Sequence, residues 1–162
     1  MSRLDSFINR VTAQRATLNW VAPLVRAMAG PVLELGLGNG RTYSHLRELF
    51  PQRDIWVFEF QVAAHPDSIP PDNLLILGDF RTTVPAAPAR IGARSPLIHA
   101  DFGSGNRDKT LELAAWLGPQ LRPLLADGGY VLSDQKLSIE RTEPLPLPAG
   151  AAPDSYYVRR SL

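Results

Sequence analysis

Short apolar runs, each bounded by glycine, proline or polar residues, recur along this chain and are typical of buried strands in a parallel sheet. Stretches with apolar residues at helical spacing, or polar turns, separate these runs. The alternation predicts an α/β fold in which a mostly parallel sheet carries crossovers on both faces. The predicted strands occupy residues 32–35, 55–58, 74–77, 96–101 and 130–132.

Two amphipathic helices are predicted before the first strand. Apolar residues recur at helical spacing over residues 4–11 and again over residues 18–28, and the polar segment 12–15 separates the two stretches. Asn19 is a suitable N-cap for the second helix, and Gly30 with the proline after it is a helix stop. The chain therefore enters the sheet from a helical N-terminal segment.

Two further helices are predicted within the sheet region. One starts near Gly40 and ends before Pro51, and the other runs from about residue 107 to residue 116. The pair Gly118-Pro119 is expected to separate the second of these from a short helical piece. Residues 61–73 are polar and rich in proline, so at most a short helical turn is expected there.

The end of the chain departs from the alternation. Two strands, residues 137–141 and 156–158, are joined by a proline-rich connection without a helix, which predicts a C-terminal antiparallel hairpin. We therefore expect one domain. It would comprise N-terminal helices over residues 1–29, a core over residues 30–134 and the hairpin over residues 135–162.

The 15 prolines are about twice the number expected from an average content of roughly 5%. Their positions mark strand entrances, helix ends and connections rather than a proline-rich binding tract. Pro119 is assigned to a helix end, and Pro85, Pro88 and Pro144 are assigned to connections. No helix is predicted between the third and fourth strands.

Composition narrows the class of protein. The 162 residues are 44% hydrophobic and 20% charged, which is ordinary for a globular chain. The absence of cysteine excludes a disulfide scaffold, a thiolate metal site and a cysteine nucleophile. A net charge of +1 gives no electrostatic reason to bind nucleic acid or an anionic membrane. With no long apolar stretch and no secretory leader pattern, a cytoplasmic location is expected.

The most informative local pattern is Gly-x-Gly-x-Gly, formed by Gly36, Gly38 and Gly40 between a predicted strand and a predicted helix. At that place in an α/β sheet, glycines allow a sharp turn and let a ligand lie against bare backbone. A dinucleotide fingerprint would need glycine at position 41, which is arginine, and no Gly-Lys-Ser/Thr of a phosphate-binding loop follows. The pattern therefore indicates a ligand crevice of another kind.

An acidic residue followed by Gly-x-Gly-x-Gly after the first strand resembles the first motif of class I S-adenosylmethionine-dependent methyltransferases. The resemblance covers roughly residues 30–134. It implies a three-layer Rossmann-like fold and S-adenosyl-L-methionine as the methyl donor. The motif positions for which it implies cofactor contacts are Glu34, Gly36, Gly38, Asn39, Gly40 and Thr42.

The resemblance extends to the ends of later strands. Such enzymes place an acid after the second strand for the ribose hydroxyls, and Glu59 lies there. They often place aspartate after the third strand for the adenine amine, which matches Asp79, with Phe80 available to pack on the ring. Each acid could alternatively cap a helix or form a turn. Acids at the ends of five predicted strands would share one edge of the sheet: Glu34, Glu59, Asp79, Asp101 and Asp134.

Catalytic residues are harder to predict from the sequence, because methyl transfer needs mainly an aligned acceptor in a desolvated site. Asp101 and Asp134 are the candidate catalytic residues, and Asp101 could instead bind the amino group of the cofactor. His99 is expected to be structural, on the sheet face opposite its two neighbours. Catechol-type relatives hold a divalent ion with Asp after strand four and Asp-Asn after strand five, but Gln135 replaces the asparagine and we expect no metal.

Three functions compete. The first is methyl transfer to an unidentified acceptor, with a small molecule favoured over nucleic acid. The second is a non-catalytic S-adenosylmethionine-binding or partner-regulating module on the same fold. The third, a nicotinamide-dependent oxidoreductase, is disfavoured by Arg41. The acceptor side would come from the N-terminal helices, the loop 102–106, the proline-rich tail, or a second copy in a homo-oligomer.

Overall fold

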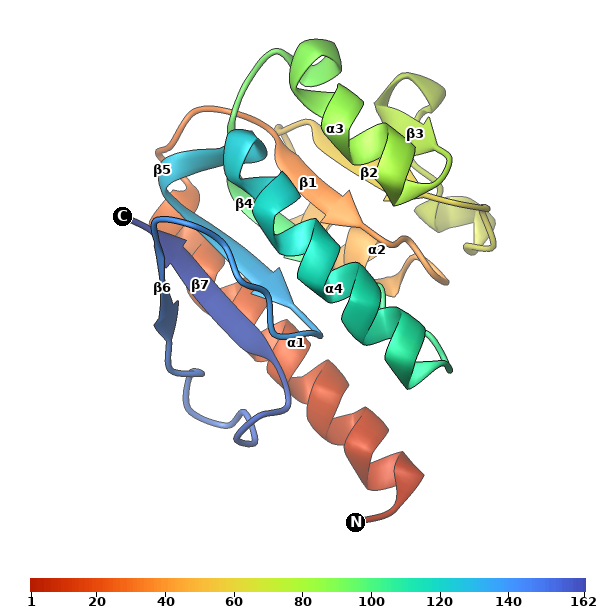
Figure 1. The fold of residues 1–162 in the computed structure, drawn as a ribbon, viewed down its shortest axis with the longest axis vertical. Helices are drawn as coiled ribbons and strands as arrows, with labels where there is room; N and C mark the ends of the chain where they lie inside the picture. Colours follow the sequence, from red (N-terminus) through yellow and green to blue (C-terminus); the bar gives the residue numbers. More distant parts are fainter.

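A seven-stranded sheet forms the centre of the structure, in the order β3-β2-β1-β4-β5-β7-β6 (Figure 1). The computed structural model describes all of residues 1–162. Strands β1 to β5 are parallel, and β7 pairs antiparallel with both β5 and β6. The strands are β1 (Val32–Leu35), β2 (Ile55–Glu59), β3 (Leu75–Leu77), β4 (Ser95–Ala100), β5 (Leu125–Ser133), β6 (Thr142–Leu145) and β7 (Tyr157–Ser161).

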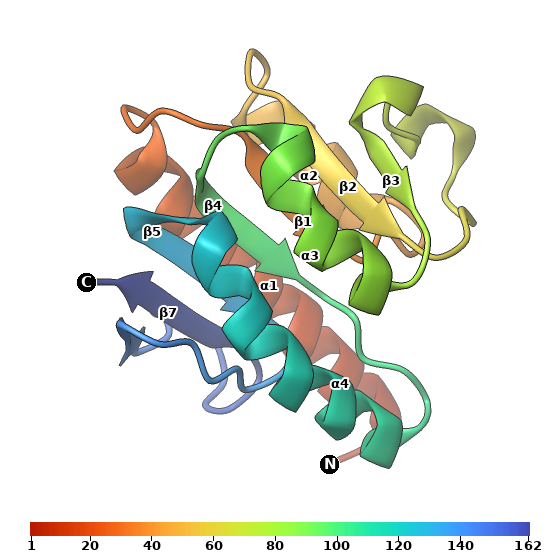
Figure 2. The ribbon, with the colours of Figure 1, turned by 45° about the horizontal axis from the view of Figure 1, so that its top comes forward.

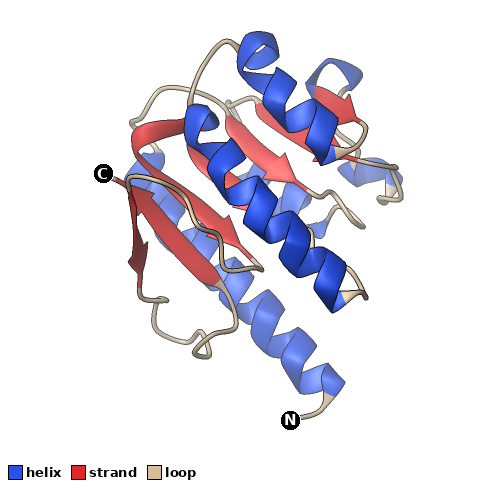
Figure 3. Ribbon diagram, viewed as in Figure 1, coloured by secondary structure: helices blue, strands red, loops and turns tan.

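Helices cover both faces of the sheet (Figure 2), and the secondary structure alternates as predicted (Figure 3). Two clusters of buried apolar side chains, one on each side, confirm the predicted three-layer Rossmann-like fold. None of the helices is both long and apolar enough to cross a membrane. One face carries α1 (Arg3–Val25) and α2 (Arg41–Leu49), and the other carries α3 (Phe80–Ile91) and α4 (Arg107–Leu121). Short 3₁₀ helices span Pro66–Ser68, Asp72–Leu74 and Arg122–Leu124.

The N-terminal segment is one helix rather than the predicted two. Ser2 caps α1 by accepting the Asp5 N–H, and the Asp5 carboxylate accepts the Ser2 N–H in return. The polar segment 12–15 continues the helix because it contains Gln14, whose side chain is buried against the sheet with hydrogen-bond partners. Asn19 therefore lies inside the helix and is not its N-cap.

Helix α3 fills a segment for which no helix is predicted. It contains Pro85 and Pro88, which the sequence pattern assigns to a connection. Each proline removes one helical hydrogen bond. Burial of Val84 and Ala87 against the sheet outweighs that loss, and Asp79 caps the helix by accepting a backbone N–H.

Helix α4 continues through Gly118-Pro119, where a break is predicted. A Cβ atom at position 118 would lie 2.3 Å from the carbonyl oxygen of Ser138. The glycine thus lets the segment after β5 pass directly against the helix, and it marks a close contact rather than a helix end. The following proline is accommodated in the last turn of the helix.

The C-terminal antiparallel hairpin is confirmed, but its strands are shifted from the predicted positions. Residues 137–141 form a loop that buries Leu137 and Ile139 in the core on the α4 side of the sheet. Strand β6 starts at Thr142 and includes Pro144, which the sequence pattern assigns to the connection. Strand β6 is an edge strand, where proline is tolerated.

Strands β1 and β4 are neighbours from which the chain leaves in opposite directions. From β1 it crosses through α2 to β2, and from β4 it crosses through α4 to β5. A crevice forms outside the carboxyl ends of strands at such a switch point. The glycine-rich segment after β1 and Asp101 after β4 therefore lie together at this crevice.

Candidate functional site

Glycine is required at the three positions of the motif for different structural reasons. All have positive φ: +93° at Gly36, +53° at Gly38 and +85° at Gly40. A Cβ atom at Gly36 would lie 2.1 Å from the carbonyl oxygen of Asp101, and one at Gly40 would lie 2.4 Å from the Cβ of Ser68. At Gly38 no atom lies within 4 Å of the added Cβ. Two glycines thus allow close packing, and the middle one opens onto a cavity.

A cavity of about 320 Å³ opens at the carboxyl ends of the strands. Three of its lining side chains are acids at strand ends, and each acid is followed by a phenylalanine that also lines the cavity. A pocket with acidic acceptors and aromatic surfaces can bind a ring system that carries hydroxyl or amino groups. The three pairs are Glu59-Phe60, Asp79-Phe80 and Asp101-Phe102.

Glu59 joins the end of β2 to the glycine loop. Its Oε2 accepts the backbone N–H groups of Leu37 at 2.8 Å and Gly38 at 3.0 Å. Its Oε1 accepts the N–H of Phe60 at 2.7 Å. A carboxylate offers about four acceptor positions, so oxygen capacity remains for hydroxyls of a ligand. The acid fixes the loop and lines the cavity at the same time.

Asp79 both caps a helix and lines the cavity. Its Oδ1 accepts the N–H of Arg81 at 2.8 Å, which is the N-cap bond of α3. Its Oδ2 accepts no hydrogen bond from the chain and is available to a ligand. Phe80, the first residue of the helix, lines the same cavity and packs on the core behind it. Helix capping and ligand binding are therefore compatible here.

A second cavity, of about 240 Å³, lies between the glycine loop and α1. Asn39 and Thr42 from the motif line it, as do Phe7 and Arg41. The two cavities share four residues, so they form one continuous cleft. The shared residues are Gly36, Gly38, Asp101 and Gly103.

Asp101 stands at the junction of the two cavities. Its Oδ2 accepts hydrogen bonds from Arg10 Nη1 and from Gln14 Nε2, both at 2.8 Å. Its Oδ1 accepts no hydrogen bond from the chain, and the side chain is 23% exposed. The cleft thus presents an ion pair, Arg10 with Asp101, whose negative partner keeps one free oxygen.

Glu34 lies outside the cleft, contrary to the predicted cofactor contact. It is the third residue of β1, and its side chain points to the α1 side of the sheet, where it is fully buried. It lines neither cavity. Its register partner on β4 is His99, and Glu34 Oε2 lies 3.1 Å from the His99 Nδ1 atom. Burial raises the pKa of the Glu34 carboxyl, against the opposing effect of the imidazole.

Asp134 anchors the loop after β4 rather than presenting a free base. Its Oδ1 accepts the N–H of Phe102 at 3.2 Å, and its Oδ2 accepts the N–H of Gly103 at 2.9 Å and the Gln135 side chain at 3.0 Å. It lines neither cavity. Burial raises the pKa of Asp134, and the charge of Asp101 adds to this. This geometry argues against the predicted catalytic role.

The sequence pattern does not single out several residues of the cleft, among them Phe60, Phe102, Arg10 and Gln14. Phe60 and Phe102 could have been found from the repeated acid-phenylalanine pair at strand ends. Arg10 and Gln14 stand four residues apart and so share one face of α1. The polarity of Gln14, which the sequence reasoning treats as part of a helix break, is the signal of its contacts with the sheet.

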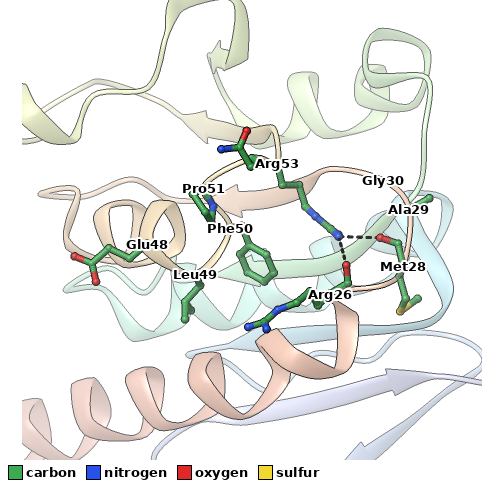
Figure 4. A pocket seen from close by; sticks show the side chains of 10 residues that line it. Arg26, Met28, Ala29, Gly30, Glu48, Leu49, Phe50, Pro51 and Arg53 are labelled. Carbon is green, nitrogen blue, oxygen red and sulfur yellow. Dashed lines mark hydrogen bonds between the residues drawn. The ribbon is translucent and has the colours of Figure 1, made fainter.

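Another cavity, of about 650 Å³, lies at the opposite edge of the sheet, near the end of α1 (Figure 4). Arg53 reaches across it and donates through Nη2 to the carbonyl oxygens of Met28 at 2.9 Å and Arg26 at 3.1 Å. These bonds satisfy carbonyl groups that the helix end leaves without partners. The guanidinium also lies 5.5 Å from the ring centroid of Phe50. Arg53 therefore has a structural role here.

Comparisons with known proteins identify the class to which this fold and cleft belong. A family model described as S-adenosyl-L-methionine methyltransferase matches residues 1–161. A crystal structure of an S-adenosyl-L-methionine methyl transferase from Silicibacter pomeroyi is 48% identical, with a TM-score of 0.94. That match covers 99% of this chain and 98% of the other.

Two more distant structures share the fold. A SAM-dependent methyltransferase from Anabaena variabilis is 15% identical with a TM-score of 0.58, over 94% of this chain and 86% of that one. DesVI from Streptomyces venezuelae is 20% identical with a TM-score of 0.52, over 93% of this chain and 66% of that one. No curated protein sequence matches the chain.

The fold and the cleft thus define an S-adenosylmethionine-dependent methyltransferase. The chain belongs to the S-adenosyl-L-methionine methyltransferase family whose model spans nearly all of it. Its cofactor is S-adenosyl-L-methionine, as the resemblance in the glycine motif implies. The nicotinamide-dependent alternative is wrong.

Proposed function

We propose that the two joined cavities hold S-adenosyl-L-methionine and that the methyl group passes to a small-molecule acceptor. The observation that carries this proposal is Asp101 at the junction, with one free carboxylate oxygen between the two cavities. When bound, the cofactor supplies a methyl group on a positively charged sulfur, which becomes a neutral thioether as the acceptor takes the methyl group. The chain contributes binding, alignment and exclusion of water.

The larger part of the cleft suits the nucleoside. Glu59 is held rigidly by three backbone N–H groups and would accept the ribose hydroxyls. The free oxygen of Asp79 would accept from the adenine amine. Phe60 and Phe80 would lie against the ring, because aromatic surfaces of this kind pack on one another.

The smaller part suits the amino-acid end of the cofactor, which carries an ammonium and a carboxylate. The Arg10–Asp101 ion pair offers the two complementary charges side by side at 2.8 Å. Asp101 would accept from the ammonium, and the guanidinium of Arg10 has further donors for the carboxylate. Two donors bond its Oδ2 and its Oδ1 is free, so Asp101 is well placed for this contact.

A small acceptor fits what remains of the cleft. The opening beside α1 is lined by Phe7 and Val11 together with Arg41 from the start of α2. The N-terminal turns of α1 project beyond the carboxyl edge of the sheet (Figure 1). Since the amino-acid end of the cofactor takes part of this cavity of about 240 Å³, the space left for an acceptor is below the size of ordinary ligand sites, which favours a small molecule over a macromolecular segment.

The test combines binding with turnover. Calorimetry with S-adenosylhomocysteine should give one-to-one binding, and a screen of small acceptors with radioactively labelled S-adenosylmethionine should give transfer. Asp101→Asn should reduce affinity at least about tenfold, because one charged hydrogen bond is worth about 1.5–3 kcal/mol. Asp108→Asn, at an exposed position without a side-chain partner, is the matched control. Binding without transfer to any acceptor would favour the non-catalytic module.

A further inference from the structure

A chain of buried polar side chains runs from the cleft into the sheet beneath Asp101. Gln14 on α1, His99 on β4, Glu34 on β1 and Tyr156 before β7 are at most 8% exposed. Gln14 Nε2 lies 2.8 Å from Asp101 Oδ2 and 3.2 Å from His99 Nε2. No role in cofactor contact accounts for the three inner residues, since none of them lines the cleft.

The hydrogen atoms of this network can be assigned from its chemistry. A carboxylate only accepts hydrogen bonds, so the Gln14 atom next to Asp101 is the amide nitrogen, and it is a donor. Burial raises the pKa of Tyr156 well above its ordinary value, with Asp101 adding to this, so the hydroxyl keeps its proton. That hydroxyl lies 2.5 Å from His99 Nε2.

The Gln14 amide nitrogen only donates, so His99 Nε2 is the acceptor in that contact, and the Tyr156 hydroxyl, which can donate or accept, is then its second donor. Both contacts are hydrogen bonds only when Nε2 carries no proton. The proton of the neutral imidazole then sits on Nδ1, which lies 3.1 Å from Glu34 Oε2 and donates to it. The structure thus describes the state in which His99 is neutral.

We propose that Gln14 and His99 are positioning residues for Asp101, and that a proton on His99 releases this positioning. The proposal rests on the proposed function, in which Asp101 binds the ammonium of the cofactor. A proton on His99 Nε2 would place the imidazolium N–H and the Gln14 amide N–H, both hydrogen-bond donors, against each other at 3.2 Å. Gln14 would turn its amide oxygen to the imidazolium, and Asp101 would lose one of the two donors that fix it.

The surroundings of His99 set the pH range of this release. Burial lowers the pKa of the imidazole, but the charge of Glu34 and its hydrogen bond, together with the charges of Asp101 and Asp134, raise it by more. The pKa therefore lies above its ordinary value of 6.5. Titratable or charged groups that face the network from the surrounding elements are Glu34 on β1, Asp101 after β4, Asp134 after β5, Tyr156 before β7 and, through Asp101, Arg10 on α1.

The test is calorimetric binding of S-adenosylhomocysteine between about pH 5.5 and pH 9. In the wild-type protein, affinity should fall at least about tenfold on the acid side of a midpoint above pH 6.5, the loss of one charged hydrogen bond. Gln14→Met should bind about tenfold more weakly at high pH and show a flattened profile. Gln52→Met, at an exposed position on the far edge of the sheet, should behave as wild type.

Two further variants should move the midpoint in opposite directions, which a merely structural role would not do. Glu34→Gln removes the charge that favours the imidazolium, so the midpoint should fall. Tyr156→Phe removes a donor to the neutral imidazole, so the midpoint should rise. Nitrogen-15 NMR of the wild-type imidazole should show a proton on Nδ1 alone at high pH, which tests the assignment without any variant.

A pH-independent affinity in the wild-type protein, or a proton on Nε2 at high pH, would overturn the proposal while leaving the proposed function standing. A complete absence of binding at about pH 8.5 would instead remove the proposed function, and this inference with it. Unchanged midpoints in folded Glu34→Gln and Tyr156→Phe proteins would also overturn it.

Discussion

The carboxylate of Glu59 accepts the backbone N–H of Gly38 at 3.0 Å, so the acid at the end of β2 holds the middle glycine of the loop after β1. The glycine motif and the acid after β2, which both suggest a cofactor site in the sequence, are therefore joined directly by a hydrogen bond. A ligand that binds Glu59 meets a carboxylate whose position the loop has already fixed.

Replacing Glu59 by glutamine should weaken S-adenosylhomocysteine binding by about 10- to 100-fold. The amide turns one acceptor oxygen into a donor, which then faces a backbone N–H of the loop or of Phe60. Lost charged hydrogen bonds of this kind are worth about 1.5–3 kcal/mol. Calorimetry measures the effect, and Glu140→Gln, at an exposed position, is the control. Equal affinities in the two variants would contradict the assigned role.

Phe60 should contribute to binding and very little to stability, because its side chain is 72% exposed. In Phe60→Ala, S-adenosylhomocysteine affinity should fall about 3- to 10-fold, the loss of one aromatic contact of about 0.5–1.5 kcal/mol. Phe60→Tyr keeps the ring and should retain wild-type affinity. Thermal melting should be unchanged in both variants. A Phe60→Ala protein that binds as tightly as wild type would exclude the ring contact.

Asp134 should control the mobility of the loop after β4. Asp134→Ala removes the acceptor for the Phe102 and Gly103 N–H groups, so amide hydrogen exchange should become faster at these two positions. Asp127→Ala, near the start of β5, loses only exposed ion pairs and should leave these amides protected. Unchanged exchange in Asp134→Ala would show that other contacts hold the loop.

The raised pKa of His99 predicts how stability depends on pH. Since the folded protein holds this proton more tightly than the unfolded chain, the free energy of unfolding should fall as pH rises from 6.5 through the raised pKa. Glu34→Gln removes the largest charge that raises this pKa and leaves burial opposed only by the charges of Asp101 and Asp134, so this contribution should shrink or change sign. Urea denaturation across that range measures both proteins. A wild-type stability that rises with pH in this window, with no difference from the variant, would contradict the sign.

The parallel strands and the glycine loop could be predicted from sequence because their signals are local. Each strand is a short apolar run, and the spacing of Gly36, Gly38 and Gly40 predicts a sharp turn. The same holds for Glu59 and Asp79, which stand directly after such runs and line the cleft in the structure.

The errors arise where tertiary contacts override a local signal. Pro85 and Pro88 indicate a break, but the face of α3 that packs on the sheet keeps the helix intact. Gln14 looks like a break in α1 because its partners, Asp101 and His99, are more than 80 residues away in the sequence. Glu34 fits the family motif, yet only the register of β1 with β4 shows that its side chain meets a histidine instead of the cleft.

The location of the cofactor is tested most directly by two matched glycine variants. Gly38 and Gly92 both have positive φ, +53° and +70°, and an added Cβ meets no atom within 4 Å at either position. Alanine should therefore cost a similar strain of about 1–2 kcal/mol in each, but only Gly38 lines the cleft. Calorimetry with S-adenosylhomocysteine should show affinity reduced at least about tenfold in Gly38→Ala and unchanged in Gly92→Ala. Equal affinity of both variants and the wild type would contradict cofactor binding against the glycine loop.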